Sequence, residues 1–354
     1  MLCRRVSLAA VMAGAIGLAV GCGSPGTAGA GAPEPATAPP LTQQPAGRVV
    51  ALPGGPEGVA VDVQAAVVAV GIQQPAGVAL VDAGTGRERQ FIPLAGAARH
   101  LELAGPAGPL LVPLENNGKL VQLALPGGAV IGDTRVGQHP HDAAAVGSLI
   151  FVGNEFSNTV SLVSGSRQVA VLPGPLQPGG VAADESFALV VGVRGRRVEA
   201  YAANGRVLGS ARAGAGPTHV QAGLGGLFYV ADTDGNAVLV FRVTASGPRQ
   251  VAAVRTEQGT PYGIAVDLRR DLVYVTLTAT NRLESFKILG TSLVPDQTWP
   301  TVRQPNSVAV DDATGRVFVA GRTDGQLELI DPGTPEHQHR VSAVYSSSMV
   351  SSGS

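Results

Sequence analysis

Cysteine is almost absent from this chain of 354 residues, which contains only Cys3 and Cys22. Two cysteines this close to the N-terminus leave the rest of the chain without a disulfide, a cysteine zinc site or a haem-attachment motif. Charged residues make up only 14% of the chain and the net charge is −1, so nothing indicates the basic surface that nucleic acid requires. No segment after Gly21 is an uninterrupted apolar run long enough to be expected to span a membrane as a helix.

The sequence also lacks the short motifs that identify common enzyme classes. It has no G-x-S-x-G nucleophile motif, no H-E-x-x-H zinc motif, no phosphate-binding loop and no EF-hand loop. We therefore predict no cofactor and assign no metal ligands. What the chain does have is glycine (48 residues), proline (26 residues) and a hydrophobic content of 45%, which indicate a folded chain with many turns.

The first residues have the features of a secretory signal. Two arginines precede the uncharged apolar run 6–20, which ends at a Gly-Cys pair. Residues 18–22 resemble a bacterial lipobox, with the departure that Ala19 stands where leucine is more usual. The resemblance implies cleavage before Cys22 and a lipid on Cys22, whereas the alternative is an ordinary signal peptide. We expect a lipoprotein signal peptide over residues 1–21 and a lipid-anchored protein at the extracytoplasmic face of the cell membrane.

The two ends of the remaining chain differ in composition from its middle. Residues 22–47 are rich in proline, alanine, glycine and threonine and carry the single charge of Glu34, which predicts a disordered, lipid-anchored tether. Residues 346–354 are predicted to form a disordered tail. Residues 48–345 are then the folded domain.

Within this domain a proline followed by a short apolar strand recurs at a period of about 40 residues, which is typical of propeller repeats. Each unit continues with a second apolar strand, a polar turn, an alternating third strand and a more polar fourth strand. Seven such units predict an all-β fold, a seven-bladed β-propeller with four antiparallel strands per blade. In one unit alanine takes the place of proline, so that the anchor positions are Pro56, Ala98, Pro140, Pro178, Pro217, Pro261 and Pro305.

The units resemble β-propellers of the YVTN/NHL type over residues 48–345. The resemblance rests on starts such as PYGIAVD at 261–267 and on strands such as FYV at 228–230. It implies the propeller fold but no single function, because such propellers include binding proteins, sensors and some enzymes. Residues 49–52 are expected to complete the last blade and close the ring, and residues 340–344 are the alternative.

Four aspartates recur just after the first strand of a unit. As metal ligands they would be spread around the ring, far from one another. We therefore expect each to bond the backbone of its own turn. They are Asp62, Asp184, Asp267 and Asp311.

Four of the six histidines fall at repeat starts. Loops that enter the innermost strands of a propeller open on one face around the central channel, together with the turns between second and third strands. The repeat starts are therefore predicted to line one funnel mouth with Glu57, Arg99, His100, His141, Asp142, His219, Tyr262 and Asn306. The turns are predicted to form an outer ring of Glu115, Asn117, Glu155, Arg194, Arg197, Asp232, Asp234, Asn281, Arg282 and Arg322.

Ionisable groups of both signs at such a mouth favour a ligand site, although any water-filled channel carries polar residues. We predict a monomeric, non-enzymatic module that binds an envelope protein, a glycan or a small ligand. A scaffold without a small-molecule site is a second hypothesis, and a lactonase-like hydrolase using funnel histidines and carboxylates, alone or with a metal, is a third. The hydrolase requires a compact set, whereas His100, Asp142 and His219 come from three blades and are expected to lie too far apart to contact one another. We also expect the histidines to be surface groups that contribute little to stability.

Overall fold

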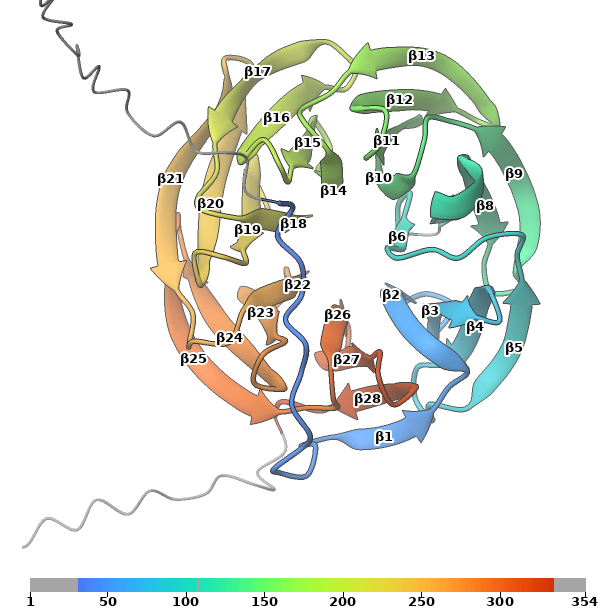
Figure 1. Cartoon of the computed structure of the whole chain (residues 1–354), viewed down its shortest axis with the longest axis vertical. Coiled ribbons are helices and arrows are strands. Elements are labelled where there is room, and N and C mark those ends of the chain that lie inside the picture. Colours follow the sequence, from blue (N-terminus) through green and yellow to red (C-terminus); the bar gives the residue numbers. More distant parts are fainter. Residues whose placement is uncertain (1–30, 107, 334–354) are drawn as a thin grey trace, which may run out of the picture. The chain divides into compact units, whose positions relative to one another are not determined.

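The computed structural model describes residues 31–106 and 108–333, and within them the chain forms seven four-stranded antiparallel sheets. Figure 1 shows these sheets as blades arranged in a ring around a central axis. The predicted all-β, seven-bladed propeller with four strands per blade is confirmed. One short 3-10 helix, η1 (Glu115–Asn117), accompanies the strands of this described part. Among the described residues, no helix is long and apolar enough to span a bilayer.

The first four blades follow one another along the chain. Blade 1 consists of β2 (Gly54–Asp62), β3 (Val67–Gln74), β4 (Gly77–Asp82) and β5 (Glu88–Pro93). Blade 2 consists of β6 (Glu102–Leu103), β7 (Leu110–Leu114), β8 (Lys119–Ala124) and β9 (Ala129–Arg135). Blade 3 consists of β10 (Pro140–Val146), β11 (Leu149–Asn154), β12 (Thr159–Ser164) and β13 (Arg167–Pro173). Blade 4 consists of β14 (Pro178–Ala183), β15 (Phe187–Gly192), β16 (Arg197–Ala202) and β17 (Val207–Arg212).

Blades 5, 6 and 7 complete the ring, and blade 7 takes one of its strands from the start of the domain. Blade 5 consists of β18 (Pro217–Ala222), β19 (Leu227–Asp232), β20 (Ala237–Thr244) and β21 (Gly247–Arg255). Blade 6 consists of β22 (Pro261–Asp267), β23 (Leu272–Leu277), β24 (Arg282–Leu289) and β25 (Ser292–Pro300). Blade 7 consists of β26 (Pro305–Asp311), β27 (Arg316–Gly321), β28 (Gln326–Ile330) and β1 (Arg48–Ala51).

Pairing of β1 with β28 closes the ring. The strands are antiparallel, with Val49 opposite Glu328 and Val50 opposite Leu327. The prediction that residues 49–52 supply the closing strand is therefore confirmed for β1, while the alternative at 340–344 lies outside the described residues.

The apolar core is divided among the blade interfaces. Seven clusters of buried side chains each join residues of two neighbouring blades, and two of them lie on either side of blade 7. Rings such as Phe318 against blade 1 and Tyr274 against blade 7 fill the wider spaces between sheets. Because every cluster needs both of its blades, the blades depend on ring closure to bury their faces.

The recurrent aspartates stabilise turns, as predicted. Oδ1 of Asp62 accepts a hydrogen bond from the backbone N–H of Ala65 at 2.9 Å. Each of the other three aspartates likewise accepts backbone N–H bonds from residues two and three positions later. The four carboxylates are thus occupied with local backbone groups.

The segment that precedes β1 differs from the disordered tether predicted for residues 22–47. Residues 32–47, which we name the N-terminal segment, cross the mouth of the ring from near β18 to β1 (Figure 1). Ala38 is only 2% exposed, and its backbone N–H donates to Gln304 Oε1 at 2.8 Å. A sequence with few apolar side chains is ordered here because its backbone bonds to polar groups of the mouth. The earlier part of the predicted tether, 22–30, lies outside the described residues.

A buried carboxylate joins the N-terminal segment to the last blade. Glu328 on β28 is fully buried, and its two oxygens accept hydrogen bonds from the backbone N–H groups of Gly47 (2.7 Å) and Val302 (3.0 Å). Burial raises the pKa of Glu328 to about 7, against the lowering effect of these hydrogen bonds. The carboxyl of Glu328 therefore keeps its proton in the folded chain at pH values where an exposed glutamate is ionised.

This raised pKa predicts a pH dependence of stability. The pKa of Glu328 in the folded chain lies above its ordinary value of 4.5. Its contribution to the free energy of unfolding is therefore fully present below pH 4.5 and is lost as the pH rises through about 7. Between pH 5 and 8, the free energy of unfolding should fall by roughly 2–3 kcal/mol more in the wild type than in Glu328→Gln, which cannot ionise. Urea unfolding of both proteins at the two pH values measures the difference, and equal pH dependence would contradict the assignment.

Candidate functional site

Backbone bulges at the repeat starts position the side chains of the mouth. In six blades the pairing of the innermost strand shifts register just after the anchor proline, for example between Pro140 and Asp142 and between Pro217 and Val220. An extra residue in one strand turns the local side chains away from the regular alternation. In blades 3 and 5 this shift lies at His141, Asp142 and His219, which line the cavities of the mouth.

Glycines at the second position allow the innermost strands to approach each other. A Cβ on Gly58 would lie 2.9 Å from the Cα of His100, and one on Gly180 would lie 3.0 Å from the Cα of His219. Real Cβ atoms essentially never come so close to backbone atoms. Glycine in the neighbouring blade is therefore required beside each of these two histidines.

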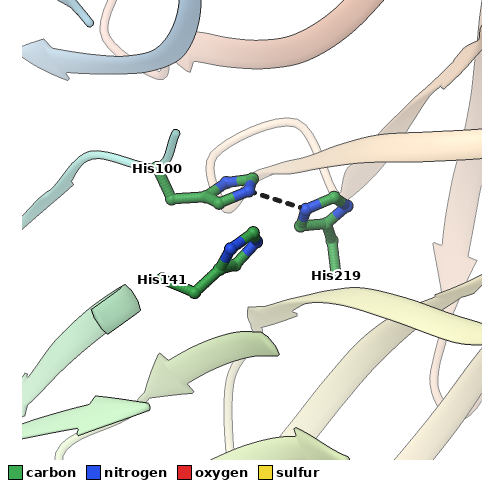
Figure 2. A group of neighbouring side chains, drawn as sticks. All are labelled: His100, His141 and His219. Carbon is green, nitrogen blue, oxygen red and sulfur yellow. Dashed lines mark hydrogen bonds between the residues drawn. The ribbon is translucent and has the colours of Figure 1, made fainter. Parts of the chain in front are cut away.

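Three of the predicted histidines meet in the mouth (Figure 2). His100 lies before β6, His141 on β10 and His219 on β18, so that they come from blades 2, 3 and 5. The Nε2 atoms of His100 and His219 are 2.9 Å apart, and one nitrogen of each ring lies within 4.8 Å of those of the other two. The expectation that His100 and His219 lie too far apart for contact is therefore wrong, because side chains reaching inward across the axis close the gap between blades.

Backbone and carboxylate acceptors orient two of these rings. Nδ1 of His219 lies 2.9 Å from the carbonyl oxygen of Tyr262, and Nδ1 of His141 lies 2.8 Å from Oε1 of Glu115. A carbonyl or carboxylate oxygen only accepts, so each Nδ1 carries the hydrogen. In the neutral rings the lone pair is then on Nε2.

The sequence placed Glu115 and Glu155 in an outer ring, whereas both contact histidines of the mouth. Oε2 of Glu155 lies 2.9 Å from Nδ1 of His139 and 3.6 Å from Nδ1 of His141. Glu115 lies on η1, the turn between second and third strands of blade 2, and Glu155 follows the second strand of blade 3. His139 was not among the predicted site residues, although its place before an anchor proline was a signal that could have identified it.

The remaining predicted mouth residues form a polar chain beside the histidines. Nη2 of Arg99 lies 3.3 Å from the hydroxyl of Tyr262, and its Nε lies 3.7 Å from Oε2 of Glu57. Oε1 of Glu57 in turn accepts a hydrogen bond from Asn306 at 3.1 Å. The Tyr262 ring meets the His219 ring edge-on with centroids 4.3 Å apart. The structure thus brings these four residues into one network with the histidines.

Burial and neighbouring charges divide the protonation states of the three histidines. Burial, with the charges of neighbouring histidines and Arg99, holds the pKa of His100 well below its usual range. Burial and the charge of His141 lower the pKa of His219 to about 3. Burial also opposes a charge on His141, but Glu155 and Glu115 outweigh it and raise its pKa. Burial thus favours the neutral forms of His100 and His219, whereas the two glutamates oppose loss of the proton from His141.

Asp142 lines a small cavity in the channel beside the histidines. Its two carboxylate oxygens accept backbone N–H bonds from Ala143 and Val181, both at 2.8 Å, and burial raises its pKa to about 6. Burial likewise raises the pKa of Glu102 to about 7, although Gln221 donates a hydrogen bond to it. These two acids enclose the cavity, of about 40 Å³, together with His100 and His219.

The N-terminal segment covers another side of the three histidines that meet in the mouth. Gln304 donates to the carbonyl oxygen of Ala36 at 2.7 Å, and Asn281 donates to that of Pro39 at 3.0 Å. A cavity of only about 20 Å³ remains between this segment and the histidines. Beside the segment, a cleft of about 560 Å³ opens to solvent and is lined by charged and polar side chains that include Arg99, Gln73 and Thr323.

The predicted outer ring does not form one site. Asn281 contacts the N-terminal segment, and Arg322 lies 3.2 Å from Glu57. Asp232 bonds backbone N–H groups of its own blade, and Arg194 is exposed. The others are engaged in local contacts or lie at the edges of grooves: Asn117, Arg197, Asp234 and Arg282.

Two groups at the mouth have the donor atoms and spacing to hold a metal ion. One is the cluster His100, His141 and His219, which we name the histidine cluster, and the other consists of Glu115, His139, His141 and Glu155. His141 and His219 are 5% and 6% exposed. The expectation that the histidines are surface groups is therefore wrong for His141 and His219, while their small effect on stability stays a prediction.

Comparisons with known proteins show the fold and no family. No family model matches the chain, and no curated protein matches it. Among solved structures, hydrazine synthase of Kuenenia stuttgartiensis is similar at 16% identity and a TM-score of 0.66, covering 80% of this chain and 96% of that chain. A streptogramin B lyase is similar at 13% identity and a TM-score of 0.66, covering 80% and 98%, and virginiamycin B lyase from Staphylococcus aureus at 12% and 0.64, covering 80% and 98%. At these identities the similarity establishes the propeller fold alone, and the resemblance to YVTN/NHL propellers stays a prediction.

Proposed function

We propose that this chain is a lipoprotein, anchored by Cys22 at the extracytoplasmic face of the membrane, whose propeller binds a ligand at the funnel mouth. The ligand is an envelope protein, a glycan or a small molecule, bound by a monomer. The observation that carries the proposal is the convergence of three histidines, Arg99 and Glu57 in one largely buried network. Such a network costs desolvation energy that an apolar mouth would not, so a binding role accounts for its presence.

The cleft beside the N-terminal segment is where we place the ligand. Its volume of about 560 Å³ falls within the range of small-molecule sites. Arg99 links it to the histidine cluster, because this side chain lines the cleft and contacts Tyr262, which packs on His219. A ligand with an anionic or hydroxyl-bearing end fits the cationic and amide groups of this cleft.

The anchor is tested by replacing each of the two cysteines in turn. Cys22→Ala should move the protein from the membrane fraction to the soluble fraction, because the following segment, with little apolar surface and the single negative charge of Glu34, has no affinity for lipid. Cys3→Ala is the matched control and should leave the distribution unchanged, since Cys3 lies in the part removed with the signal peptide. Immunoblots of fractions washed in high salt measure the result, and a Cys22→Ala variant that is processed but stays with the membrane would overturn the anchor. Both positions lie outside the described residues.

Binding at the mouth is tested by photo-crosslinking in living cells. A photoreactive phenylalanine analogue in place of Thr323, an exposed residue of the cleft, should give crosslinked products that mass spectrometry can identify. The same analogue in place of Val130, which is 55% exposed on the outer strand β9, is the control. Identical products from the two positions, or none from Thr323, would contradict a binding role for the mouth.

A lactonase-like hydrolase is the second candidate, and the compactness of the histidine cluster favours it. Such an enzyme would add water to the lactone carbonyl and break the ring C–O bond, giving a hydroxy acid, with a neutral histidine as general base. Hydrolysis of glucono-δ-lactone, followed by acid release, should then be faster with the wild type than with His100→Ala. Equal rates for both proteins and buffer would exclude hydrolysis of this substrate by the cluster.

A further inference from the structure

We propose that the histidine cluster binds one divalent first-row transition-metal ion of the Zn²⁺ type. The inference deepens the proposed function, on which it rests, by naming a ligand that the mouth takes. It stands on the geometry of His100, His141 and His219, whose nitrogens converge within 4.8 Å of one another from three blades (Figure 2).

The orientation of the rings is the first support. Metal-bound histidines usually donate their second ring N–H to a carboxylate or a backbone carbonyl, which fixes the ring and directs the other nitrogen at the metal. His219 is held in this way by the Tyr262 carbonyl and His141 by the Glu115 carboxylate. In both rings Nε2 is then the nitrogen available to a cation.

The spacing of the nitrogens is the second support. Bonds of about 2.0–2.1 Å to a metal place two nitrogen ligands about 2.9 Å apart at a right angle and about 3.3 Å apart at the tetrahedral angle. The observed separation between Nε2 of His100 and Nε2 of His219 is 2.9 Å. A shift of His100 Nε2 by a few tenths of an ångström would reach the tetrahedral distance, and His100 is the most exposed of the three histidines.

The chemistry of the donors selects the class of metal. Three imidazoles suit Zn²⁺, Cu²⁺, Ni²⁺ or Co²⁺, whereas Mg²⁺ and Ca²⁺ require oxygen ligands. Three protein ligands also leave a coordination position open. A cavity of about 40 Å³, lined by His100 and His219 but not by His141, has room for a water molecule beside two of the three ligands.

The neighbouring carboxylates support the site from outside it. Glu115 and Glu155 make direct contacts of 2.8 Å and 2.9 Å with Nδ1 atoms of His141 and His139, so their nearest oxygens are already engaged with imidazole hydrogens. Their negative charge near His141 favours a cation, against the opposing positive charge of Arg99, which contacts Glu57 and Tyr262. We therefore assign the metal to the three histidines and not to the mixed group that contains His139.

Metal binding is tested on the full chain, purified without a histidine tag, stripped with a chelator and dialysed against ZnCl₂. The expected result is one Zn²⁺ per chain by elemental analysis, with an X-ray absorption spectrum of three imidazole nitrogens at about 2.0–2.1 Å. This measurement uses the wild type and does not depend on the folding of any variant. A chain that retains no Zn²⁺, or a metal surrounded mainly by oxygen, would overturn the assignment.

His141 belongs to both candidate metal groups, so the two groups are told apart by replacing a histidine that occurs in only one of them. His100→Ala removes a ligand of the histidine cluster and should weaken Zn²⁺ binding by at least about 100-fold. His139→Ala should weaken binding far less than His100→Ala, and the double change His337→Ala and His339→Ala, in the part of the chain outside the described residues, should leave the affinity unchanged. Thermal unfolding without metal checks that each variant is folded. If His139→Ala weakened Zn²⁺ binding more than His100→Ala, the metal would belong to the mixed group instead.

The proposed function is tested separately, because membrane association through Cys22 and crosslinking at the mouth do not depend on any metal.

Discussion

Closure of the ring is the constraint on which the rest of this structure depends. Every blade buries its two faces against its neighbours, and the seven apolar clusters lie at the seven interfaces. The last blade has only three strands from the C-terminal part of the domain and takes its fourth, β1, from the start of the domain. The short β1–β28 ladder, from Arg48 opposite Leu329 to Ala51 opposite Gln326, therefore joins the beginning and the end of the whole propeller.

The same constraint creates the candidate site. Seven innermost strands must converge on one axis, where space is small, and their first residues cannot be buried in a blade interface. Bulges after the anchor prolines turn those residues inward, and glycines such as Gly58 and Gly180 let the strands approach. The neighbouring blade has a glycine beside His100 and beside His219, which leaves room for both histidines close to the axis. The geometry of the site is thus a consequence of packing in the inner ring and not of a local motif.

This origin explains what could be predicted from the sequence. The regular repeat period, the anchor prolines and the turn residues are local signals, and they were sufficient for the fold, the closing strand and the aspartates that bond their own turns. The repeat logic also placed His100, His141 and His219 at one mouth. It could not give their separation, because the distance between side chains from different blades depends on ring diameter and side-chain direction, which no spacing along the chain encodes.

Two further differences have distinct physical causes. Glu115 and Glu155 were placed in an outer ring because the position in the repeat shows on which face of the propeller a residue lies. It does not show whether the side chain points toward the central axis. Residues 32–47 were predicted to be disordered because composition measures the apolar surface that a segment can bury. Their order comes instead from backbone groups that bond to Gln304, Asn281 and Thr278. A polar mouth can thus order a segment that an apolar surface could not.

The N-terminal segment links three features that would otherwise be separate. Along the chain it follows the proposed lipid anchor at Cys22, then covers the histidine cluster, and then continues into the strand that closes the ring. Glu328 bonds the backbone at Gly47, where the segment meets β1, so the cover is attached to the closing ladder itself. Access to the histidine cluster from this side requires the segment to leave Gln304 and Asn281, but it does not require β1 to leave β28. The bonds that hold the cover to the mouth are therefore separate from the ladder that closes the ring.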